Sequence, residues 1–156
     1  MTDWVRRLDP DATDLQLIAA RAHHLRRWSV PRSSYPDGRS GYLRWRTALR
    51  KQHGEEVAAI LAEVGYDEAE IDRVRSIVRK DGLARDPQVQ THEDALCLVF
   101  LTTQFDELSE RLGDEHIVEV VRKTLTKMSE EGIGRAVELP LSERGRAIVE
   151  RASRPA

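Results

Sequence analysis

Apolar residues recur three and four positions apart through most of this chain of 156 residues, which is the spacing of helix faces that pack against a core. No segment shows the sustained alternation of apolar and polar residues that is typical of a strand. Capping residues and glycines divide the pattern into helices over about 10–28, 41–64, 68–80, 91–112, 114–128 and 142–152. The sequence therefore predicts an all-α fold, a single compact helical bundle of about six to seven helices.

Two segments fall outside this pattern. Residues 1–9 are expected to form a loosely ordered lead-in to one helical domain that spans 1–156. Residues 29–40 contain two prolines, a Pro-Asp-Gly turn and four serines, which predicts an irregular loop. A loop of about a dozen residues is longer than most connections inside a domain, and long ordered loops are often functional.

Composition narrows the class of protein. Cys97 is the only cysteine, so an internal disulfide and a cysteine-based zinc site are excluded. The longest apolar run is 95–101, far short of the roughly 20 residues that span a bilayer, and the N-terminus lacks the apolar run of a signal peptide. We therefore expect a cytoplasmic protein with no membrane segment.

Positive charge is concentrated between Arg21 and His53. This stretch holds nine arginines and lysines and one acid, Asp37, although the formal net charge of the whole chain is −2. Arginine forks and the start of a helix after the loop favour phosphate oxygens. The expected anion-binding residues are Arg27, Arg32, Tyr35, Arg39 and Arg46. Salt bridges to the acidic remainder of the chain, or simple solvation, would explain the same pattern.

Imidazoles and carboxylates on separate predicted helices form a second constellation. It comprises His24, His53, Glu93 and Asp94, with His23 in reserve. Nitrogen and carboxylate oxygen are ligands for divalent metals, and a helical bundle can gather them from several helices. The pattern is equally typical of buried histidines hydrogen-bonded to carboxylates. His92 and His116 are interpreted as surface residues near helix starts.

Three long motifs resemble a widespread family that is catalogued only as a domain of unknown function. They are AARAHHLRRWSVPRSSYP, GYLRWRTALRKQH and HEDALCLVFL. The resemblance covers most of the chain. It implies no particular activity.

A more distant resemblance is to the HD superfamily of helical, metal-dependent phosphohydrolases, carried by HGEEVAAILAEVGYDEAEIDRVRSIVRKDGL. It aligns His53 with the first metal-binding histidine and Asp94 with the final aspartate. Lys80 occupies the place of the histidine in the His-Asp doublet, where it would neutralise a phosphate. The resemblance implies a divalent Mn, Mg or Fe ion held by His24, His53 and Asp94, with Glu93 and Asp94 as catalytic groups.

Two functions follow as hypotheses. The first is a metal-dependent phosphohydrolase that acts on a nucleotide or another small phosphorylated substrate. The second is a non-catalytic module that has lost the metal and binds phosphate, a nucleotide or RNA through its basic stretch. The first requires the ring nitrogens of His24 and His53 and the carboxylate of Asp94 to converge on one point. The sequence does not indicate an oligomeric state.

Overall fold

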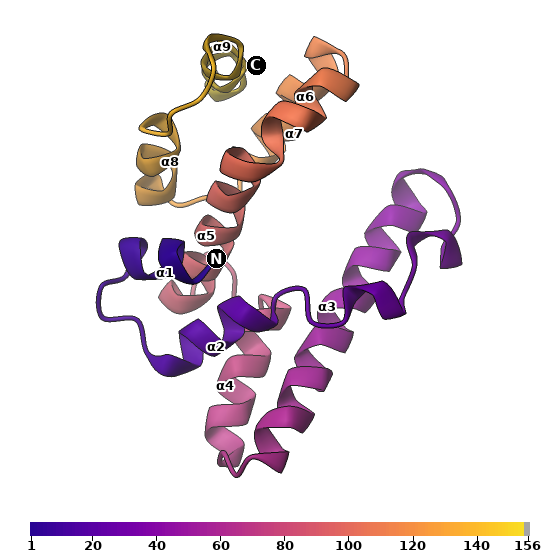
Figure 1. Cartoon of the computed structure of the whole chain (residues 1–156), viewed down its shortest axis with the longest axis vertical. Helices are drawn as coiled ribbons and strands as arrows, with labels where there is room; N and C mark the ends of the chain where they lie inside the picture. Colours follow the sequence, from indigo (N-terminus) through magenta and orange to yellow (C-terminus); the bar gives the residue numbers. More distant parts are fainter. Residues whose placement is uncertain (155–156) are drawn as a thin grey trace.

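The computed structural model describes residues 1–154, and over this range the chain forms nine α-helices and no strand (Figure 1). The helices are α1 (Thr2–Leu8), α2 (Asp14–Ala22), α3 (Gly38–Glu63), α4 (Glu68–Arg79), α5 (Pro87–Thr103), α6 (Phe105–Arg111), α7 (Asp114–Leu125), α8 (Glu130–Val137) and α9 (Glu143–Ser153). Two single-turn 3₁₀ helices, Arg27–Ser29 and Arg32–Ser34, lie in the loop between α2 and α3. The all-α prediction is confirmed.

Helix α5 connects two apolar clusters. Near its N-terminus, Val89 packs with the side chains of α2, α3 and α4. Further along, Leu98 and Leu101 are completely buried among side chains of α6, α7, α8 and α9. Figure 1 shows that the N-terminal half of α3 runs apart from α6 and α7. A pocket lies between these elements, and Cys97, Phe100 and Val120 of the second cluster line part of it.

Several elements differ from those expected. Residues 2–8 form α1 rather than a loose lead-in, and Val5 is buried against Ala20 and Ala95. The first long helix ends at Ala22, not near residue 28. The helix expected over 91–112 is interrupted at Gln104, where α5 gives way to α6. A short helix, α8, also forms between residues 129 and 141, where the sequence pattern predicts no helix.

The loop before α3 is held by its own side chains. Arg32 donates hydrogen bonds to the carbonyls of Tyr35 and Pro36, both at 2.9 Å. The indole Nε1 of Trp45 donates to the carbonyl of Val30 at 2.9 Å. At Gly41 a Cβ would lie 1.8 Å from the carbonyl oxygen of Pro36, so only glycine allows the loop to approach α3 this closely. The loop is therefore held in a fixed position against the N-terminal half of α3.

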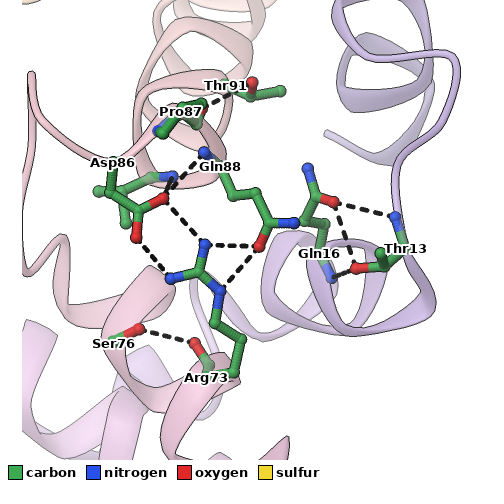
Figure 2. Close-up of polar contacts among 9 residues, drawn as sticks. Thr13, Gln16, Arg73, Ser76, Asp86, Pro87, Gln88 and Thr91 are labelled. Carbon is green, nitrogen blue, oxygen red and sulfur yellow. Dashed lines mark hydrogen bonds and ion pairs between the residues drawn. The ribbon is translucent and has the colours of Figure 1, made fainter.

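An ion pair joins α4 to the start of α5. The Arg73 guanidinium donates to both carboxylate oxygens of Asp86, at 2.5 and 2.8 Å, and also to the side-chain oxygen of Gln88 (Figure 2). Asp86 is the N-cap of α5 and accepts from the backbone N–H groups of Gln88 and Val89. The hydrogen bond from Arg73 is the main reason that the pKa of Asp86 falls to about 2. One carboxylate thus both caps α5 and fixes its position relative to α4.

Replacing Asp86 separates these two roles. Asp86→Asn keeps a good cap and loses the ion pair, so we expect the free energy of unfolding at pH 7 to fall by about 1 kcal/mol, as for other half-exposed pairs. Asp86→Ala removes the cap as well and is expected to cost about 2 kcal/mol. Urea unfolding followed by circular dichroism measures both. Equal losses in the two variants would contradict the capping role.

Candidate functional site

A pocket of about 530 Å³ lies between α3 on one side and α5 and α7 on the other. The end of α2 and the residue that follows α4 close its base, through His23, His24 and Lys80. Helix α3 contributes one face, since Tyr42, Arg46, Arg50 and His53 follow one another at helical spacing. A volume of this size is typical of sites for small molecules.

The lining of the pocket is strongly positive. Its charged side chains are six cations, Arg21, Arg27, Arg46, Arg50, Lys80 and Lys127, and one carboxylate, Glu93. Lys80 and Glu93 form an ion pair in which each side chain is only 4% exposed. The five other cations form no ion pair with any carboxylate of residues 1–154. None of these five cations is therefore neutralised by a carboxylate in direct contact.

Aromatic rings fix two of these arginines. The Arg27 guanidinium lies 4.9 Å from the ring centroid of Trp45, and that of Arg46 lies 5.8 Å from the ring centroid of Tyr42. Arg27 also donates from Nη1 to Nε2 of His24 at 2.9 Å. Because a guanidinium can only donate, His24 accepts through Nε2 and carries its proton on Nδ1. Burial, followed by the charge of Arg27, lowers the pKa of His24 to about 4.

Four histidines form a chain, in the order His92, His23, His24 and His53, and the last three line the pocket. Nδ1 of His23 lies 3.1 Å from Nε2 of His92, so one ring donates and the other accepts. The centroids of His24 and His53 are 6.4 Å apart. Burial lowers the pKa of all four rings, that of His92 to about 4. The chain is therefore uncharged at neutral pH.

His53 has unused hydrogen-bonding capacity. Its side chain lines the pocket and is 3% exposed, yet Nδ1 has no hydrogen-bond partner among the described residues. A buried polar atom without a partner is costly to the folded state unless a ligand or water meets it. Nδ1 itself has almost no accessible surface, so the His53 ring contributes to the pocket through its other atoms.

The two neighbouring acids of α5 point to different places. Glu93 lies in the pocket beside Lys80. Burial raises the pKa of Glu93, but the charge and the hydrogen bond of Lys80 have the larger combined effect, so the pKa of Glu93 lies below its usual value. The Asp94 carboxylate faces α8 instead. It accepts from the backbone N–H of Ser129 at 2.9 Å, from the Ser129 hydroxyl and from the amide of Gln90.

A family model for a domain of unknown function, DUF4202, matches residues 1–149. The chain belongs to the DUF4202 family. Searches of curated proteins and of solved structures find no significant match. The expected family resemblance is thus confirmed, whereas the HD superfamily resemblance is not. The activity of this DUF4202 protein has to be inferred from the pocket itself.

The predicted metal ligands of the DUF4202 chain are not brought together. His24 and His53 line the pocket, but the Asp94 oxygens are occupied by Ser129 and Gln90. The remaining acid, Glu93, is paired with Lys80. Over residues 1–154 no group of three histidine, cysteine or acidic side chains is placed to hold a metal ion. The donor set therefore does not fit the divalent ion that the HD resemblance implied.

The predicted anion-binding residues divide into two groups. Arg27, Arg46 and Lys80 line the pocket of the DUF4202 protein. Arg32 and Tyr35 are outside the lining, where Arg32 is bonded to loop carbonyls, and Arg39 is an exposed residue of α3.

No helix among the described residues is long and apolar enough to cross a membrane.

Sequence reasoning missed three contributors to the site. His92 was interpreted as a surface residue, but it is 1% exposed and bonded to His23. Arg50 lies four residues after Arg46 and three before His53, a spacing that already places all three on one helix face. Lys127 comes from beyond the end of α7, and no local pattern marks it as a pocket residue.

Proposed function

We propose that this protein binds a small phosphorylated molecule in the pocket between α3 and α5. The observation that supports the proposal most strongly is the charge of the lining, in which five cations lack a carboxylate partner among residues 1–154. Such a surface repels itself unless an anion neutralises it. Arginine pairs on phosphate oxygens form short, charge-assisted hydrogen bonds, which neutral ligands cannot offer.

The neutral histidines fit the same ligand. His23, His24 and His53 line the pocket, and neutral imidazoles add hydrogen-bonding groups without adding charge. The volume favours a mononucleotide or another phosphorylated metabolite over the extended backbone of RNA. The single cysteine, Cys97, is free and buried, which accords with a proposed location in the reducing cytoplasm.

Metal-dependent hydrolysis remains a prediction that the pocket does not favour, because Asp94 is turned to α8. It is tested by incubating the protein with pyrophosphate or adenosine monophosphate in the presence of Mn²⁺ and measuring phosphate release. Turnover that requires the added ion would replace the binding proposal with the phosphohydrolase. Binding without turnover agrees with the proposal.

The binding proposal is tested by calorimetric titration with pyrophosphate at fixed ionic strength. Arg46→Gln removes one unpaired cation from the lining and is expected to weaken binding by about tenfold or more, the effect of losing a charge-assisted hydrogen bond. Arg44→Gln is the matched control, because Arg44 is exposed on the same helix and lies outside the lining. Equal losses in the two variants would indicate attraction to general surface charge and overturn the site. Absence of any binding would overturn the function.

A further inference from the structure

The wall of the pocket that faces the arginines is apolar. Helix α5 presents Glu93, Leu96 and Phe100 along one face, which its C-cap Gln104 continues, and α7 adds Val120 and Thr124. At 1.5 Å per residue, the α5 face runs about 16 Å from the ion pair at the base to Gln104. One side of the same cavity is therefore cationic, and the other is hydrocarbon over most of its length.

Two apolar side chains on this wall lack the packing expected of them. Leu96 and Val99 are only half-buried, and neither joins any of the three apolar clusters of the described residues. Both line the pocket, as do Phe100 and Val120, which are half-buried at the edge of the cluster around α7. When a ligand covers apolar surface on a concave wall beside a charged site, the burial lowers the free energy of the complex.

We infer that the ligand is a phosphate monoester with an apolar organic group, and that this group lies against the α5 and α7 wall while the phosphate meets the α3 arginines and the histidine chain. The inference rests on the proposed function and narrows it to a class of molecule. The wall offers few hydrogen-bonding groups, chiefly Gln104 and Thr124. It therefore recognises the apolar surface of the organic group more than its polar edge.

The continuity of the two walls supports this class over an inorganic anion. A bare phosphate would occupy only the base of the pocket and leave Leu96, Phe100 and Val120 against water. Lys127, beyond the end of α7, lies near Glu93, since its charge acts on that carboxylate. The charged end of the site and the hydrocarbon wall are thus joined through both α5 and α7.

A series of probes tests the inference. Inorganic phosphate, ribose 5-phosphate, phenyl phosphate and 1-naphthyl phosphate share the charged group and differ in apolar surface. Affinity measured by calorimetry is expected to rise about tenfold from phosphate to phenyl phosphate, and again to naphthyl phosphate, because each ring covers more of the wall. Ribose 5-phosphate is expected to bind no more tightly than inorganic phosphate.

A variant locates the effect on the wall. Leu96→Gln is expected to remove most of the advantage of naphthyl phosphate and leave the affinity for inorganic phosphate unchanged, and the fold should survive because Leu96 belongs to no core cluster. Leu43→Gln is the matched control, since Leu43 is 52% exposed on α3 and outside the lining. Equal affinity for phosphate and naphthyl phosphate would overturn the inference and leave the proposed function standing. An aryl advantage that persists in Leu96→Gln would overturn the placement on this wall. Failure of every probe to bind would overturn both.

Discussion

Acidification from pH 7 to pH 4 is expected to lower the free energy of unfolding by at least about 3 kcal/mol, through the buried histidines. In the unfolded chain an imidazole takes up its proton near pH 6.5. In the folded protein the pKa of His92 is about 4, because burial and the nearby Lys80 disfavour its charged form. Between these values the unfolded state binds more protons than the folded state, so stability falls as the pH falls from 6.5 to 4.

The geometry leaves little room to relieve this effect. When both rings are charged, each of the facing nitrogens, Nδ1 of His23 and Nε2 of His92, carries a proton and neither can accept. The groups nearby are mostly positive or imidazole, and Glu93 is already paired with Lys80. His23 has its pKa lowered further than His92, so it resists protonation still more strongly.

Urea unfolding at half-unit steps between pH 7 and pH 4 measures the total loss and its slope. His92→Gln cannot titrate and still offers a donor or an acceptor to His23, so its slope between pH 6.5 and pH 4.5 is expected to fall by up to about 1.4 kcal/mol per pH unit. His116→Gln serves as the control because His116 is an exposed residue of α7 outside the histidine chain. An unchanged slope in His92→Gln would show that the buried ring does not carry the acid sensitivity.

The helices were predictable where apolar spacing and caps agree. Thr13 with Gln16 and Asp67 with Glu70 form the reciprocal capping boxes that the sequence indicates, and they start α2 and α4. Helix α1 was missed because seven residues are too few to form a stable helix alone, and only the packing of Val5 against other helices stabilises it. The break at Gln104 was missed because neither glycine nor proline marks it.

The site was predictable only in part, because neighbouring residues on a helix point about 100° apart. Of Glu93 and Asp94, only one can face the pocket, and the sequence does not contain the information that selects it. The choice is made by partners far along the chain: Ser129 holds Asp94, and Lys80 holds Glu93. The basic stretch was recognisable from charge alone. The sequence does not show which arginines donate hydrogen bonds to loop carbonyls, because that depends on the path of the loop.

Glu93→Gln is expected to be the most damaging single substitution in the pocket, with a loss of about 3–5 kcal/mol at pH 7. The Lys80 and Glu93 side chains are each 4% exposed, so removal of the carboxylate leaves a buried ammonium without its counter-charge. Burial already lowers the pKa of Lys80, and Glu93 provides the main opposing effect. Glu119→Gln is the matched control, because Glu119 makes exposed pairs with Arg122 and Lys123. The melting temperature of this control variant is expected to match that of the unmodified protein.

The double variant Lys80→Met with Glu93→Gln distinguishes the charge from the shape of the side chains. Methionine fills much of the volume of lysine without its charge, so the double variant is expected to recover most of the stability lost in Glu93→Gln. A double-mutant cycle by urea unfolding gives the coupling between the two positions. If the losses simply add, the ion pair is not what stabilises the base of the pocket. Recovery of stability in the double variant would show that this base tolerates a neutral pair, and pyrophosphate titration of the same variant then reports how much Lys80 contributes to binding the anion.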